Sequence, residues 1–361
     1  MTPYILLILI ALSLSFSTKT LNVNRTKRIF SVTFFFLLLY LLFVLRDINI
    51  GRDLPGYSDT YDDARYYNWF DSSWTYMEAG YVFLMKLCSS FGLSFKWFMS
   101  ICYILVVIPL GKYVCKYSKD ISLSLIIYLC FQFFVFNMSG LRQSMAMSLC
   151  LMALMVGQQK GIVSFIKYLL LVLCATLIHR SALVFVPAYF LMRVTINFKL
   201  GLLYLFLGII ASSVKMTLLQ FLQDNEVTRY EFNEALTNGA SFIMLLLILI
   251  VSMFLSKSSN FKNDTGNLQT SDTIKLTLGN YANLLAISLL LLVTFSGTIL
   301  MRSASYYNIV LIILVPELLN RFNSSVKPIA KIAFMTLMIG IFYFTVLVPN
   351  QFDIVPYRFD F

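Results

Sequence analysis

Long apolar stretches recur along almost the whole of this 361-residue chain, and they constrain its fold more than any other feature. Apolar residues make up 59% of the sequence and charged residues only 12%, and the mean hydropathy is +0.80. Soluble domains contain roughly 45–50% apolar and about 25% charged residues. The composition therefore excludes a soluble, disordered or disulfide-stapled protein. It predicts an all-α polytopic membrane protein with a single membrane domain over residues 1–361.

Twelve stretches are candidates for transmembrane helices, because a helix needs about 20 apolar residues to cross the hydrocarbon core. Two of them are short, so a count of ten to twelve fits the pattern. The first stretch has no basic region before it and a basic cluster after it, so it is interpreted as a span rather than a cleaved signal peptide. The stretches are 3–18, 29–45, 94–111, 121–137, 143–157, 162–178, 181–193, 200–222, 240–256, 277–300, 303–320 and 329–348.

The basic residues between these stretches alternate from one side to the other. Connections after odd-numbered spans hold 16 basic and four acidic residues, whereas the opposite side holds 10 basic and 13 acidic residues. Basic loops stay in the cytoplasm, so both termini are expected outside, in the periplasm. The connection 223–239 is then a second outer loop, and the polar connection 256–275 is a flexible cytoplasmic loop.

The formal net charge of +11 is therefore a property of short cytoplasmic loops. It does not indicate a nucleic-acid partner, whose phosphates would need a continuous basic surface. No phosphate-binding glycine motif occurs, so no nucleotide cofactor is expected. The six cysteines lie in or beside apolar stretches without CxxC or Cys/His spacing, so neither disulfides nor a metal site are expected.

The outer segment 46–78 is the largest polar part of the chain. It holds seven of the 17 acidic residues together with seven tyrosine and tryptophan residues. Such rings form an aromatic belt at a membrane surface, but rings mixed with carboxylates also describe a sugar-binding surface, and both interpretations stay open here. The following stretch, 79–92, is apolar but short, so it is expected to be re-entrant or to lie along the membrane surface.

Three further outer features carry charge at the ends of apolar stretches. Arg142 stands just inside a span, where a charge costs roughly 2.5–3.5 kcal/mol unless it has a partner or only snorkels to the surface. His179 is the only histidine, and it is followed by Arg180. A lone histidine is either structural or a proton carrier. Arg302 precedes Tyr306 by about one turn, which by itself describes a membrane anchor.

Taken together, the outer cations are mainly arginines. Arginine grips phosphate in two places, whereas lysine acts as a point charge. The sequence therefore suggests a lipid-linked phosphate or pyrophosphate as the ligand. The arginines considered are Arg46, Arg52, Arg142, Arg180 and Arg302.

Five of these segments, in this order, resemble the EpsG-like branch of the Wzy-type polysaccharide polymerases. The match is one of pattern and order over about residues 46–316. One departure is Arg180, which replaces the small residue usual after the histidine and leaves open which of the two carries the role. The segments are RDINIGRDLPGYSDTY, MEAGYVFLMKLCSSFG, NMSGLRQSMAMS, HRSALVFVPAYF and RSASYYNIVLIILVP.

The resemblance implies a glycosyltransferase of the bacterial inner membrane that needs no metal or cofactor. It would join undecaprenyl-pyrophosphate-linked repeat units at the periplasmic face to make O-antigen (and so lipopolysaccharide), capsule or exopolysaccharide. Membrane lipids and a chain-length regulator are the further partners considered. The candidate catalytic residues are Asp53 or His179 as base and Arg142, and the candidate pyrophosphate- or sugar-binding residues are Arg52, Arg180, Arg302, Glu78, Tyr57 and Tyr306.

Two other classes of function are alternatives to a polymerase. A flippase for the same lipid-linked unit would need charges along a path through the membrane, and Lys167 and Lys215 are the only mid-span candidates. A sugar O-acyltransferase would need a donor site on the cytoplasmic side, where no histidine lies. An O-antigen ligase ranks lower still because the late outer loop 223–239 is short.

Overall fold

We describe the protein from a computed structural model, which places residues 1–19, 25–69, 71, 73, 75–224, 239–258, 273–295 and 299–360. Across these ranges the chain is helical and contains no strand. The α-helices are α1 (Thr2–Lys19), α2 (Arg25–Val44), α3 (Leu54–Asp63), α4 (Ala79–Ser90), α5 (Phe95–Tyr117), α6 (Ile121–Cys130), α7 (Phe133–Ser139), α8 (Leu141–Gly157), α9 (Ile162–Ile178), α10 (Ala188–Leu191), α11 (Phe198–Asp224), α12 (Gly239–Ser258), α13 (Leu278–Thr294), α14 (Ser305–Asn308), α15 (Leu311–Asn320) and α16 (Val326–Phe342). Two 3-10 segments, η1 (Arg180–Phe185) and η3 (Ile299–Ala304), and a π-helical turn, η4 (Tyr343–Leu347), complete the set.

Four of the described helices are long and apolar enough to cross a membrane, namely α2, α5, α12 and α16 with its η4 extension. Two broken helices, α6–α7 and η3/α14–α15, each bend by 43° and raise the number to six. The predicted helical membrane protein is thus confirmed. The count of twelve stays a prediction, because the other apolar helices are shorter over the residues whose side chains the structure describes, for example Thr2–Leu14 of α1 and Phe198–Val214 of α11. The predicted loops 223–239 and 256–275 lie largely outside the described residues.

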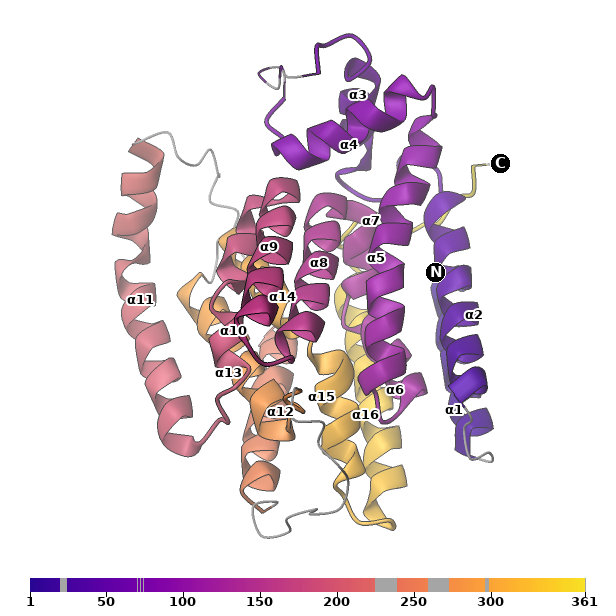
Figure 1. Cartoon of the computed structure of the whole chain (residues 1–361). Helices are drawn as coiled ribbons and strands as arrows, with labels where there is room; N and C mark the ends of the chain where they lie inside the picture. The colour runs from indigo at the N-terminus through magenta and orange to yellow at the C-terminus, as the bar shows by residue number, and fades with distance from the viewer. Residues whose placement is uncertain are drawn as a thin grey trace.

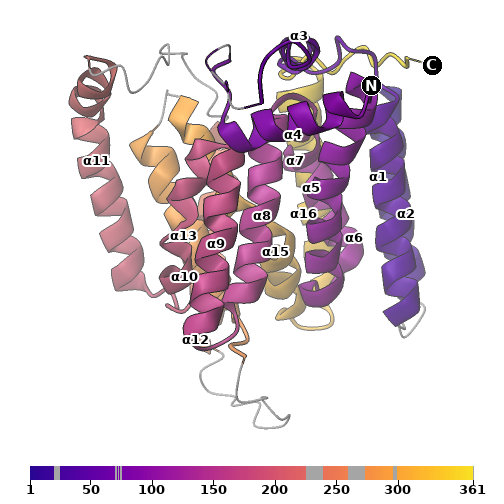
Figure 2. The same cartoon turned by 45° about the horizontal axis from the view of Figure 1, so that its top comes forward.

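Two short helices close one end of the bundle. Figures 1 and 2 show α3 and α4 lying over the ends of the long helices, with α4 running across them, and Figure 2 shows both chain termini toward this end. α4 corresponds to the stretch 79–92 that was expected to be re-entrant or interfacial. Gly80 lets it sit directly on the end of α9, because a Cβ atom at this position would lie 2.7 Å from the carbonyl oxygen of Leu177. We call this end of the bundle the capped end.

The C-terminal tail holds the segment that leads into α3. The amide of Gly51 donates to the Asp353 carbonyl at 3.1 Å, and the amide of Arg52 donates to the Phe352 carbonyl at 3.1 Å. Gly51 has φ +108°, and a Cβ atom there would lie 2.2 Å from the carbonyl oxygen of Met138. Only glycine fits this conformation and this close approach. The start of α3 is therefore fixed against both α7 and the tail.

Arg46 is a structural residue rather than one of the outer phosphate-binding arginines with which the sequence grouped it. Its side chain is fully buried, and its Nη1 donates to the carbonyl of Met138 at 2.9 Å. Its guanidinium carbon lies 4.2 Å from the ring centroid of Phe43. A buried cation is tolerated when it has such partners. Arg46 therefore ties α2 to α7 and is not accessible to a ligand.

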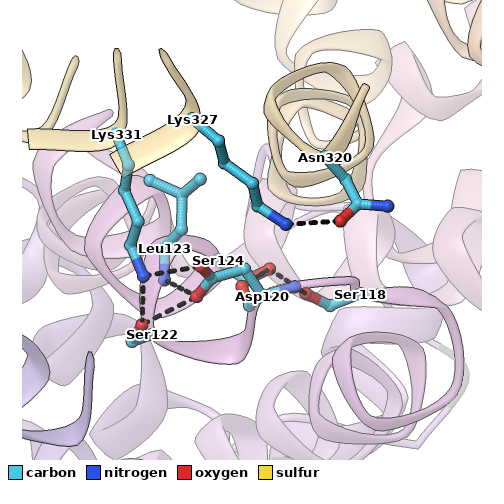
Figure 3. A network of polar contacts seen from close by, with 8 residues as sticks. All are labelled: Ser118, Asp120, Ser122, Leu123, Ser124, Asn320, Lys327 and Lys331. Carbon is cyan, nitrogen blue, oxygen red and sulfur yellow. Dashed lines mark hydrogen bonds and ion pairs between the residues drawn. The ribbon is translucent and has the colours of Figure 1, made fainter. Parts of the chain in front are cut away.

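The opposite end of the bundle contains a polar network without a free carboxylate (Figure 3). Asp120 caps α6 by accepting from the amide of Leu123 at 3.2 Å, and its other oxygen accepts from Lys331 Nζ at 2.5 Å. The hydroxyl of Ser122 donates to the same carboxylate at 2.7 Å. Because the Lys331 side chain is buried and Asp120 is partly buried, removing one partner of this pair is destabilising. The network therefore joins α6 to α16 and needs no ligand to explain it.

Candidate active site

Glu78 is positioned by the start of α4. Its backbone is extended, and its carbonyl accepts the first helical hydrogen bonds, from the amides of Tyr81 and Val82 at 3.0 Å each. Its side chain is only 9% exposed. Because Gly80 brings α4 onto the end of α9, the Glu78 carboxylate points into the bundle instead of toward water.

Three charged segments, far apart in sequence, meet at this carboxylate. Arg142 of α8 donates from Nη1 to Glu78 Oε2 at 2.6 Å. His179, which follows α9, places Nδ1 3.1 Å from Oε1. The backbone amide of Arg180 donates to the same Oε1 at 3.0 Å. We call Glu78, Arg142 and His179 the Glu78 cluster.

The surroundings of Glu78 stabilise its charged form. Burial would raise the pKa of its carboxyl group. The hydrogen bonds from His179 and the Arg180 amide, together with the charge of Arg142, outweigh burial and lower this pKa from 4.5 to about 2. Glu78 is thus an anion throughout the physiological range. A carboxylate at this position accepts a hydrogen bond from Nδ1–H of His179, and in the neutral imidazole with that tautomer the lone pair is on Nε2.

Replacing Glu78 with glutamine is expected to lower the thermal unfolding temperature at neutral pH. A depressed pKa contributes stability above its unfolded value near 4.5, and this contribution is lost as the pH falls toward 2. The shift corresponds to a contribution on the order of 3 kcal/mol. Thermal unfolding of the detergent-solubilised wild type and Glu78→Gln, measured between pH 2 and 7, should therefore show two curves that converge in acid. Asp59→Asn, which removes an exposed carboxylate of α3, is the matched control. A gap between wild type and Glu78→Gln that is independent of pH would contradict the assignment.

Tyrosine rings surround the Arg142 guanidinium. Its central carbon lies 5.6, 5.4 and 6.0 Å from the ring centroids of Tyr57, Tyr76 and Tyr81. Its Nε lies 3.5 Å from the Tyr57 hydroxyl. Tyr57 and Tyr81 are buried, whereas Tyr76 is 76% exposed. Rings of the outer segment therefore hold the arginine in place by cation–π contact, and Tyr76 is left at the surface above it.

The late arginine–tyrosine segment joins the same region. Gln143, next to Arg142, donates to the backbone carbonyl of Arg302 at 2.8 Å. The hydroxyl of Tyr306 lies 3.0 Å from that of Ser181, two residues after the histidine. The structure thus brings together four of the segments that the sequence singled out. Arg302 itself is half-buried.

Three of the other candidate side chains form no hydrogen bond or ion pair with the Glu78 cluster in the described part of the chain. Arg52 forms an ion pair with Asp353 at 3.0 Å, and both side chains are about half exposed. The backbone amide of Asp53 donates to the hydroxyl of Ser139 at 3.3 Å, and its carboxylate lies near Tyr57 rather than on the histidine. The Arg180 side chain is exposed, and only its backbone contacts Glu78. Trp74, one of the seven tyrosine and tryptophan residues of the outer segment 46–78, lies outside the described residues.

The sequence did not predict that Glu78 joins the arginine to the histidine. A sign was present, because this glutamate stands directly before a short apolar helix with a glycine at its second position. Gln143 and Tyr81 were also missed, since a glutamine and a tyrosine beside apolar residues carry little signal alone. Over the described ranges no group of three histidine, cysteine, aspartate or glutamate side chains is arranged to hold a metal ion.

Comparison with known proteins gives one result of wide coverage. The model of the EpsG family matches residues 4–359, which is nearly the whole chain. No curated protein and no solved structure matches the chain. The family match includes every segment on which the resemblance to EpsG-like proteins was based, as well as the C-terminal tail that packs on residues 47–52. The chain belongs to the EpsG family.

Proposed function

We propose that the protein is a polysaccharide polymerase that joins lipid-pyrophosphate-linked oligosaccharide repeat units in the bacterial inner membrane. The observation that carries this proposal is the Glu78 cluster, which places an oriented histidine beside a ring-bound arginine at the end of a helical membrane protein. A histidine can take the proton of a sugar hydroxyl, and an arginine stabilises a departing pyrophosphate. Membership of the EpsG family supports a role of this type.

In the reaction, the acceptor hydroxyl oxygen forms a bond to the anomeric carbon of the donor sugar. The bond from that carbon to the pyrophosphate oxygen breaks, and its electron pair leaves with undecaprenyl pyrophosphate. His179 Nε2 accepts the hydroxyl proton. Glu78 holds His179 through Nδ1, much as a carboxylate orients the base of a catalytic triad. Because both Glu78 oxygens have protein donors, this role replaces the expected contact with sugar hydroxyls.

Arg142 is the residue assigned to the leaving group. Its Nη1 binds Glu78 and its Nε faces the Tyr57 hydroxyl, so the Nη2 N–H groups are the ones assigned to phosphate oxygens. Arg302 and the exposed Arg180 are the further cations of this region. His179 is preferred over Asp53 as the base, because His179 contacts the Glu78 carboxylate directly. No contact of the Asp53 carboxylate with His179, Glu78 or Arg142 is found in the described part of the chain.

The proposal also includes the orientation of the protein in the membrane. The capped end, which carries the cluster and both termini, faces the periplasm, and twelve spans connect it to the basic cytoplasmic loops. The distribution of lysine and arginine between the loops supports this orientation. The product is O-antigen, capsule or exopolysaccharide, and a chain-length regulator is the candidate protein partner.

Polymerisation by the purified protein tests the function. Full-length protein in lipid nanodiscs is mixed with undecaprenyl-pyrophosphate-linked repeat units from the host strain, without any nucleotide sugar. We expect a ladder of glycans on a gel. A strain that lacks the gene should carry single repeats on its surface lipid, and the plasmid-borne gene should restore the ladder. Loss of all repeats in that strain would indicate a ligase, and trapping of the units inside the cell would indicate a flippase.

A further inference from the structure

A cavity lies on the other side of α14 from the Glu78 cluster. It has a volume of about 140 Å³ and is bounded by α7, α12, α14 and the C-terminal tail. By the same measure one water needs about 10–15 Å³, so the cavity has room for a larger molecule. Five aromatic rings line it, those of Phe131, Phe133, Phe136, Phe242 and Phe352.

Polar side chains point to the kind of molecule that fits. Gln132, Ser241 and Ser305 also line the cavity. In the described part of the chain no hydrogen bond of these three side chains is found, although each is partly buried. Asn308 lies in the wall as well, where its Oδ1 accepts from the hydroxyl of Ser288 at 2.5 Å. An acyl chain would leave these polar groups without partners, which is unfavourable.

Both broken helices contribute to this wall. Gln132 has φ +69°, a left-handed conformation that is uncommon for residues other than glycine, and it separates α6 from α7. Ser305 and Asn308 belong to the broken pair that continues into α15. In membrane proteins, irregular backbone within a span is tolerated where it lines a cavity, and helix breaks of this kind form ligand sites in transporters.

The cavity and the Glu78 cluster share α14. Tyr306 and Tyr307 turn to the cluster side, where their hydroxyls contact Ser181 and the carbonyl of Val184. Ser305 and Asn308 turn to the cavity. A molecule that reached across this single helical turn would therefore touch both places.

We propose that this cavity is a second glycan site, which holds one pyranose ring of the oligosaccharide while the Glu78 cluster acts on another part. Aromatic faces pack on the apolar face of a sugar ring, and amide and hydroxyl groups bind its hydroxyls. The five rings together with Gln132, Ser241 and Ser305 provide that combination. The inference rests on the proposed function for the identity of the glycan, and it adds a binding site outside the reacting residues.

Binding of a lipid-free oligosaccharide tests the site. The probe is the single repeat unit released by partial acid hydrolysis from the polysaccharide of the host strain, with a fluorescent label at its reducing end. Full-length protein in nanodiscs is titrated with this probe. Ser241→Phe fills the cavity and should weaken binding at least about tenfold, and Ser241→Ala should weaken it about fivefold, as expected for one lost hydrogen bond. Leu247→Phe adds a ring to the same helix at a residue that is 55% exposed, and it should bind as the wild type does.

The outcomes separate this site from the proposed function. Wild-type binding by both Ser241 variants would overturn the cavity site, even if the wild type polymerises repeat units. Release of a co-purified lipid by Ser241→Phe, with probe binding unchanged, would overturn it in favour of a lipid site. Failure of the wild type to polymerise repeat units, with binding that still depends on Ser241, would overturn the proposed function alone.

Discussion

Replacing Arg142 with alanine is expected to reduce polymer formation by at least about 10³-fold while the protein remains in the membrane. Loss of a group that stabilises charge in the transition state costs roughly 10²–10³ in rate. Here the same change also removes the 2.6 Å partner of Glu78 and the cation around which Tyr57 and Tyr76 are arranged. The measurement is the glycan ladder from nanodiscs and from complemented cells, with the amount of protein determined by immunoblot.

Two further variants separate chemistry from folding. Arg65→Ala removes an exposed outer arginine whose side chain contacts the carbonyl of Leu93 and the ring of Tyr61, and it should make wild-type polymer. The double change Glu78→Gln with Arg142→Ala leaves no unpaired charge, so it should unfold at a higher temperature than Arg142→Ala and still make no polymer. Full chain lengths from Arg142→Ala would disprove the assignment of this residue.

Replacing His179 with glutamine is expected to reduce the rate of linkage formation by about 10²–10⁴-fold, the range for a general base. Glutamine retains a hydrogen-bond donor for Glu78 but cannot accept a proton at neutral pH. Arg180 is the best matched comparison in the structure. Its side chain is exposed, while its backbone amide binds the same Glu78 oxygen as His179 does. Arg180→Gln keeps that amide and should lose at most about tenfold, the effect of a weaker pyrophosphate contact.

The variants His179→Gln and Arg180→Gln decide which of these two residues carries the role at this position. The departure from the family pattern at Arg180 left that question open. Initial rates should be measured at saturating donor, so that a loss of binding by Arg180→Gln is distinguished from a loss of chemistry by His179→Gln. Equal losses at saturation would mean that the histidine is not the base. A loss by Arg180→Gln alone would make Arg180, as a cation on the leaving pyrophosphate, the residue that carries the role at this position.

Much of the architecture could be read from local features of the sequence. Hydropathy identified a helical membrane protein, because a segment without charges has the same preference for lipid wherever it packs. The short stretch after residue 78 was recognised as unlike the others, and the structure forms α4 there. The order of five segments was sufficient to suggest the family that the comparison then established.

The sequence predicted individual residues of the site but not the contacts between them. Arg142, His179 and Arg302 were each singled out as polar residues at helix ends. A charge at a helix end is also typical of a side chain that only anchors the helix at the membrane surface. Glu78 was assigned to sugar hydroxyls because nothing local shows that both of its oxygens are occupied. Arg46 looked like the other outer arginines, and only packing against Phe43 and Met138 places it inside.

The sequence by itself determined that this protein lies in a lipid bilayer, that it is helical, and which residues could build a site. These depend on transfer free energies and on charge, which are properties of each segment alone. Only the tertiary structure decided that Glu78 meets Arg142 and His179, 64 and 101 residues further along the chain. It also decided that the tail packs on residues 47–52 and that two broken helices enclose a cavity. Such contacts depend on how helices pack across long separations in sequence, and on glycines such as Gly51 and Gly80 that permit close approach.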